Sequence, residues 1–236
     1  MIRTALTAAL LCAGAAQADE MFVEANVLGI FYHELGHALI DIEGVPIFGQ
    51  EEDAADVFSI FLIDALFEED AAQSIAYDAA FGFAGEVEMR EQAGEEVAWW
   101  DVHGPDEQRY YNTVCIFYGA DPDKRADLAE ELGLPEDRAE YCPDEYDQAA
   151  HSWGAVLDEM AERGAGKTLS LEGEDGSLTA QLLAQEIRDL NAVFSLSAPL
   201  TVTLESCGEA NAFYDPETTE IIMCTEFEDH IREMAK

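Results

Sequence analysis

Residues 33–37 read His-Glu-Leu-Gly-His, and residues 52–56 read Glu-Asp-Ala-Ala-Asp. Two histidines four residues apart lie on one face of an α-helix, where both imidazoles can bind a single metal ion. A carboxylate at Glu52 would add a third ligand, with Asp56 one turn further on the same face. Three protein ligands leave the fourth position of a zinc ion open for water or substrate. The two strings therefore predict two successive helices around one catalytic Zn²⁺ ion per chain.

The residues around the first string favour this interpretation. Apolar residues between Met21 and Ile42 recur close to the 3.6-residue period of a helix, and Gly44 and Pro46 are stop signals. In a zinc site, Glu34 would lie beside the metal and take a proton from a water molecule. The alternative is a histidine pair on a solvated helix face with Glu34 as a surface charge, because this motif arises by chance in about one such chain per hundred.

The N-terminus has the pattern of a secretory signal peptide. Arg3 precedes an apolar stretch, and Ala16-Gln17-Ala18 matches a cleavage site before Asp19. We expect residues 1–18 to be removed and the protein to be periplasmic or secreted. No other segment approaches the ~20 apolar residues of a spanning helix. Residues 19–236 are expected to form a single metallopeptidase-like domain.

Four cysteines remain after the predicted cleavage, and export permits them to form disulfides. Four cysteines allow three pairings. The simplest is local, Cys115 with Cys142 and Cys207 with Cys224. The alternative is a zinc site made of all four cysteines, but no C-x-x-C spacing supports it.

The net charge is −40, from 51 acidic and 11 basic residues. Such a charge repels DNA, RNA and anionic membranes, so the composition argues against a nucleic-acid partner. A hydrated surface suited to salt explains the charge, and attraction of cationic peptides is the functional alternative. The oligomeric state stays open.

The remaining pattern predicts an α+β fold that is predominantly α-helical, with a small C-terminal β-hairpin or sheet. Residues 19–163 are expected to be helical and residues 164–236 to be mixed α/β. The expected helices are 21–42, 51–67, 69–80, 86–99, 106–118, 144–163 and 179–192, and the expected strands are 168–171, 200–204 and 220–224.

The run FYHELGHALIDIEGVPIFGQEEDAADVFSIFL, residues 31–62, resembles the bacterial metallopeptidase family DUF4344, and so does DVHGPDEQRYYNTVCIFYGADP at 101–122. More widely, the chain resembles gluzincins, whose pattern is H-E-x-x-H followed by E-x-x-x-D. This resemblance implies zinc on His33, His37 and Glu52, Glu34 as general base, and Asp56 as support for His33. The gap of fourteen residues before Glu52 is shorter than in thermolysin-like enzymes, which also brings Glu51 and Asp53 into consideration. Only Glu52 has Asp56 four residues later.

A second resemblance lies at Asn211-Ala212-Phe213-Tyr214, which is similar to the N-A-x-Y segment of neprilysin-like peptidases. That resemblance implies that Asn211, Ala212 and Tyr214 bind the substrate backbone beside the zinc cleft. In neprilysin-like enzymes the segment precedes the zinc motif, whereas here it follows. The alternative is a disulfide-pinned hairpin with a turn at Asp215-Pro216.

His103 is a candidate for stabilising the oxyanion of the reaction, together with Asp101 and Arg109. A structural role near the start of a helix is the alternative. His151 is expected in the core or at its rim, and His230 in a solvated tail. The sequence thus predicts zinc-dependent hydrolysis of peptide bonds in a peptide or protein substrate. The alternatives are a non-catalytic zinc-binding envelope protein and a zinc hydrolase of a non-peptide amide.

Overall fold

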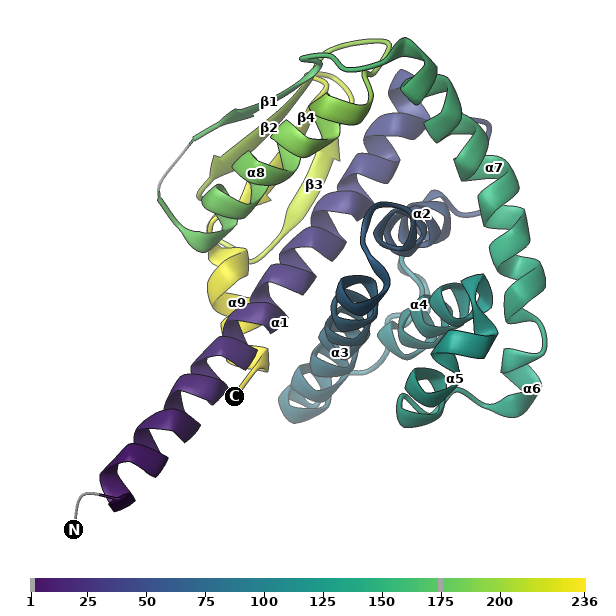
Figure 1. Ribbon diagram of the computed structural model, residues 1–236. Helices are drawn as coiled ribbons and strands as arrows, with labels where there is room; N and C mark the ends of the chain where they lie inside the picture. The colour runs from purple at the N-terminus through teal and green to yellow at the C-terminus, as the bar shows by residue number, and fades with distance from the viewer. Residues whose placement is uncertain (1–2, 174–175) are drawn as a thin grey trace.

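The computed structural model describes residues 3–173 and 176–236, and it has the predicted α+β architecture with helix predominating. Two groups of elements, one helical and one mixed, follow each other along the chain (Figure 1). In chain order the elements are α1 (Arg3–Ile42), α2 (Glu51–Leu66), α3 (Glu69–Ala93), α4 (Asp106–Ala120), α5 (Pro122–Glu131), α6 (Glu136–Ala139), α7 (Cys142–Arg163), β1 (Leu169–Glu172), α8 (Leu178–Val193), β2 (Leu200–Glu205), β3 (Ala212–Asp215), β4 (Glu220–Cys224) and α9 (Glu226–Met234).

Helix α1 runs between the two groups, with the sheet and α8 on one side and α2 to α7 on the other (Figure 1). It begins at Arg3 rather than at Met21, because the Ala- and Leu-rich segment before Met21 has high helix propensity. Residues 3–18 of this helix coincide with the predicted signal peptide, of which Met1 and Ile2 lie outside the described residues.

The sheet has the strand order β1-β2-β4-β3, with β3 at one edge. β1, β2 and β4 are parallel, and β3 pairs with β4 in antiparallel orientation. Val202 on β2 and its cross-strand partner Ile221 on β4 are fully buried, whereas Thr201 and Thr203, on either side of Val202, are only partly covered. The buried face packs on α1 and α8, which places the edge strand β3 beside α1.

The helical part differs from expectation in α3, which is one helix instead of two segments at 69–80 and 86–99. Gly82 and Gly85 do not interrupt it, because each lies where another helix packs closely. A Cβ at Gly82 would lie 1.8 Å from Asn26 Oδ1, and one at Gly85 would lie 2.8 Å from Met234 Sδ. The helix ends at Ala93, where Gly94 adopts a left-handed conformation, so that Trp99 lies in a loop.

Three helices lie in segments where the sequence predicted none, namely α5, α6 and α9. Helix α9 replaces the expected solvated tail: Ile231 is fully buried and His230 Nε2 lies 2.6 Å from Glu86 Oε1. His151, expected in the core or at its rim, is exposed on α7.

Both locally paired disulfides are present. Cys115 and Cys142 join α4 to α7, and Cys207 and Cys224 join the segment after β2 to the end of β4. Among the helices of the described residues, none is long and apolar enough to cross a membrane.

Candidate metal centre

Small residues set the distance between α1 and α2. A Cβ on Gly36, within the motif of residues 33–37, would lie 3.0 Å from the Cα of Ala55 on α2. Helix α1 then ends in a Schellman motif, in which Gly44 has a φ of 67° and the N–H of Val45 donates to Ile40 O at 2.9 Å. The chain turns back, and α2 begins with Glu51, Glu52 and Asp53, whose negative charges suit a helix N-terminus. This compact turn bridges the short gap between the two motifs.

The side chains of His33, His37 and Glu52 meet at one point. Glu52 Oε2 lies 3.2 Å from His33 Nε2 and 3.0 Å from His37 Nε2, and the two Nε2 atoms are 3.2 Å apart. Glu51 contacts only the outer nitrogen of His37, and Asp53 is exposed. Of the three carboxylates considered for a third ligand, the geometry therefore favours Glu52.

The distances within this cluster fit a metal ion. A tetrahedral zinc ion with ligands at about 2.0–2.1 Å separates its ligand atoms by about 3.3 Å. The three separations here are close to that value, and two imidazole nitrogens with one carboxylate oxygen are a donor set that zinc accepts. His33 and Glu52 also form a set of three potential ligands with His103, in which all ligand atoms lie within 4.8 Å of one another. The structure thus contains a His/Glu/His cluster that could hold a metal ion.

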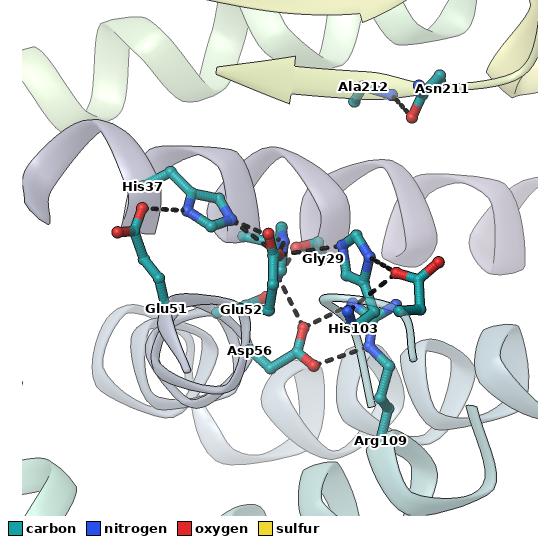
Figure 2. A network of polar contacts seen from close by, with 12 residues as sticks. Gly29, His37, Glu51, Glu52, Asp56, His103, Arg109, Asn211 and Ala212 are labelled. Carbon is teal, nitrogen blue, oxygen red and sulfur yellow. Dashed lines mark hydrogen bonds and ion pairs between the residues drawn. The ribbon is translucent and has the colours of Figure 1, made fainter. Parts of the chain in front are cut away.

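A carboxylate also contacts the Nδ1 atom of His33 and of His37, on the side of each ring away from the cluster. Asp56 Oδ1 lies 2.7 Å from His33 Nδ1, and Glu51 Oε1 lies 2.9 Å from His37 Nδ1. Asp56 in turn accepts two hydrogen bonds from Arg109, from Nε at 2.8 Å and from Nη2 at 2.7 Å (Figure 2). Such outer contacts fix the ring orientation of metal-binding histidines.

The cluster attracts positive charge. Burial lowers the pKa of His33, but hydrogen bonds to Asp56 and Glu52 outweigh it and raise the pKa to about 9. Burial works against the charged form of Glu52, yet hydrogen bonds from His103, His33 and His37 hold its pKa well below its usual range. The carboxylates therefore favour the protonated form of His33, and a bound cation would take the place of that proton.

Glu34 lies next to the cluster and is buried, with 5% of its surface exposed. Burial raises the pKa of its carboxyl above the usual value, and the neighbouring His33 and His37 oppose that rise. The side chain nevertheless lines the cleft, so that it can meet a water molecule or a substrate there.

His103 reaches the cluster from the loop between α3 and α4 (Figure 2). Its Nε2 lies 3.0 Å from Glu52 Oε2, and its Nδ1 lies 3.3 Å from Asp101 Oδ1. Arg109 does not join Asp101 as expected, because its guanidinium pairs with Asp56 and lies 4.5 Å from the centre of the Phe83 ring.

A cleft of about 1070 Å³ opens over the cluster. Helix α1 forms its floor, β3 forms one wall, and the start of α2 with residues 101–103 forms the other. A smaller cavity of about 300 Å³ continues along α1, and it shares His33, Glu34, His103 and Ala212 with the cleft.

Strand β3 borders this cleft with a free edge. The N–H of Cys224 donates to Asn211 O at 3.1 Å, so alternation along the antiparallel pair directs the backbone groups of Ala212 and Tyr214 away from β4. Asn211 Oδ1 accepts from the N–H of Ala212 at 2.9 Å. Tyr214 lines the cleft, but its hydroxyl lies 2.7 Å from Asp41 Oδ2. Asn211 and Ala212 lie on one side of α1, and α2 with Glu51 and Glu52 lies on the other side (Figure 2).

The sequence did not predict the contact between Arg109 and Asp56. The two residues are 53 positions apart, and no spacing rule connects them. A carboxylate taken out of water requires a compensating charge, but several arginines could have provided it.

The chain belongs to a family whose model matches residues 9–157 and 172–236, namely DUF4344, described as "Putative metallopeptidase". No curated protein and no solved structure matches the chain. The family description agrees with the cluster in associating this chain with a metal and with peptidase-like function.

Proposed function

We propose that this protein is a zinc-dependent peptidase that holds the metal with His33, His37 and Glu52. The observation that carries the proposal is the convergence of these three side chains beside the buried Glu34, at the base of a cleft with a free strand edge. Bound zinc would supply a Lewis acid that lowers the pKa of a water molecule toward ~7 and polarises a carbonyl group.

The chain's own residues then carry out the proton transfers. Glu34 takes a proton from the attacking water and delivers it to the amine that leaves, so one C–O bond forms as the C–N bond breaks. His103 Nε2 is the candidate donor to the carbonyl oxygen as negative charge develops there. Asp56, held by Arg109, keeps His33 in position.

The substrate peptide would lie along β3. An extended peptide can add to this edge as a further strand, using the C=O of Ala212 and the backbone groups of Tyr214, whereas the N–H of Ala212 donates to Asn211 Oδ1. The Asn211 amide can bond to the same peptide at its end near Glu34 and His33, with which it lines the smaller cavity. The Tyr214 hydroxyl bound to Asp41 would position the strand rather than the substrate.

We further propose that the protein acts after export. The two disulfides agree with an oxidising compartment, and the pattern of residues 1–18 is that of a cleaved signal peptide. Protein recovered from the periplasm or medium should then begin at Asp19, which N-terminal sequencing would establish. An N-terminus at Met1 in that fraction would contradict cleavage.

The test of function compares Glu34→Gln with Glu24→Gln, a control on the same helix that is not among the residues lining the cleft. Wild-type protein and control should contain about one zinc ion per chain and cleave a mixed peptide library, and a chelator should abolish cleavage. Glu34→Gln should retain zinc but lose more than about 100-fold of the activity, because an amide cannot accept the proton. Cleavage at the wild-type rate by Glu34→Gln would refute the mechanism.

A further inference from the structure

Three imidazoles, rather than two, surround Glu52 Oε2 in the same way. The Nε2 atoms of His33, His37 and His103 lie 3.2, 3.0 and 3.0 Å from that single oxygen. The Nδ1 atom of each ring faces a carboxylate oxygen, which belongs to Asp56, Glu51 and Asp101 respectively. Metal-binding histidines have this arrangement: one ring nitrogen faces the metal site, and the other is bound to a carboxylate.

His103 differs from the other two histidines in where the chain carries it. The side chains of His33 and His37 on α1 are 4% and 12% exposed, whereas that of His103 is 44% exposed. Its loop is held by local contacts, such as the N–H of Asp101 to Ala98 O and the N–H of His103 to Asp101 Oδ1. Trp99 and Trp100 in this loop are 80% and 85% exposed, so little apolar packing fixes the loop to the body.

We propose that His103 is a fourth protein ligand of the metal, so that the resting centre is closed, and that the loop of residues 95–105 must withdraw it before substrate binds. The inference rests on the proposed zinc centre and adds its regulation. Four protein ligands complete a tetrahedral zinc site and leave no position for water, whereas three leave one open.

The ligand role and the donor role of His103 exclude each other at any one moment. A ligand uses the lone pair of Nε2, while a hydrogen-bond donor needs a proton on the same atom. The loop therefore switches the centre between two states. With His103 on the metal the enzyme is latent, and after withdrawal the same imidazole can face the substrate oxygen.

The experiment counts imidazoles around zinc by X-ray absorption, in wild type, His103→Ala and His151→Ala. His151 is an exposed histidine on α7 that lies outside the cleft and serves as the matched control. Wild type and the control should show three imidazoles, and His103→Ala should show two. The zinc dissociation constant of His103→Ala should rise by more than about tenfold, the smallest loss expected even for an outer-shell partner. Two imidazoles in wild-type protein would overturn the proposal without reference to any variant.

Peptide cleavage separates this inference from the proposed function. Two imidazoles in a wild-type enzyme that cleaves the library would remove His103 as a ligand and leave the peptidase assignment in place. Three imidazoles, with no cleavage by wild type or by His103→Ala, would retain the closed centre and reject the peptidase assignment. Wild-type protein that binds no zinc would overturn both.

Discussion

At the scale of single residues, Asp56 links Arg109 to His33. It accepts two hydrogen bonds from Arg109 and faces His33 Nδ1 at 2.7 Å. The guanidinium beside it is the main influence that holds the pKa of Asp56 below its usual range despite burial. Asp56 thus stays charged and keeps His33 in the orientation that points Nε2 at Glu52.

Replacing Asp56 by Asn should therefore weaken metal binding more than it alters the fold. The amide keeps an oxygen for Arg109 but loses the negative charge that supports the imidazole, so the zinc dissociation constant should rise about 10- to 100-fold. Competition with a chelator measures this change. Asp53→Asn, an exposed substitution one turn earlier on α2, is the control and should bind zinc like wild type. Equal affinity of Asp56→Asn and wild type would contradict the positioning role.

The sequence could predict that His33, His37 and Glu52 are neighbours. Helical geometry places His33 and His37 on one face of α1, and Glu52 lies on the next helix, α2. The sequence made His103 a candidate for the site, but its approach to Glu52 depends on a loop path that residue spacing does not fix. Arg109 was expected beside Asp101, and its actual partner depends on how α4 packs against α2. Local periodicity contains no information about such packing.

At the scale of secondary structure elements, the sequence predicted α2, α4, α7, α8, β1, β2 and β4, but it missed α5, α6, α9 and the continuity of α3. Helices were predicted at 69–80 and 86–99, and the gap between them contains Gly82 and Gly85, each of which provides space for a contact from another element. The helix gains burial against α1, α4 and α9 that outweighs the low helix propensity of glycine. Tertiary packing therefore decided the continuity of α3.

The crossing of α4 and α7 depends on Gly119. A Cβ at this position would lie 2.2 Å from the backbone oxygen of Cys142, whose side chain is bonded to Cys115. Gly119→Ala should lower the free energy of unfolding by about 1–3 kcal/mol, because the two helices must separate. Gly154→Ala on α7, where the nearest atom is Phe61 Cζ at 3.8 Å, should instead stabilise by up to about 1 kcal/mol. Chemical denaturation of both variants measures the difference, and equal effects would contradict this packing.

The start of α3 is fastened to α5 by a charge pair. Glu69 accepts hydrogen bonds from Arg125 Nε and Nη2 at 2.9 and 3.0 Å, and this pairing lowers the pKa of Glu69 to about 2. A carboxylate with a lowered pKa contributes stability above its unfolded value near 4.5, and loses it as the pH falls through about 2. The free energy of unfolding should therefore fall between pH 4.5 and 2, and less steeply in Glu69→Gln.

The control for this pH dependence is Glu68→Gln, the exposed neighbour whose side chain makes no capping hydrogen bond. Denaturation at several pH values gives the difference between each variant and wild type. If Glu69→Gln follows the wild-type slope throughout this window, the ion pair does not contribute as described.

At the scale of the whole molecule, the negative charge extends into the cleft. The net charge is −40. Asp41, Glu51 and Asp101 line the cleft in addition to Glu34 and Glu52. Among the described residues that line it, none is lysine or arginine. Field lines in a cleft lined by one sign of charge concentrate ligands of the opposite sign. The acidic surface noted in the sequence thus bears on the substrate as well as on hydration.

A pair of peptides that differ only in carrying lysines or glutamates should therefore be cleaved at different rates, with the cationic peptide having the higher kcat/KM. Salt should reduce the difference, because the Debye length falls from about 10 Å at 0.1 M to about 3 Å at 1 M ionic strength. An uncharged peptide of the same length corrects for effects of salt on the enzyme itself. A preference that stays constant across this range would mean that short contacts, rather than the field of the cleft, select the substrate. A preference for the anionic peptide would contradict the electrostatic argument altogether, since the cleft lining then could not be what attracts the substrate.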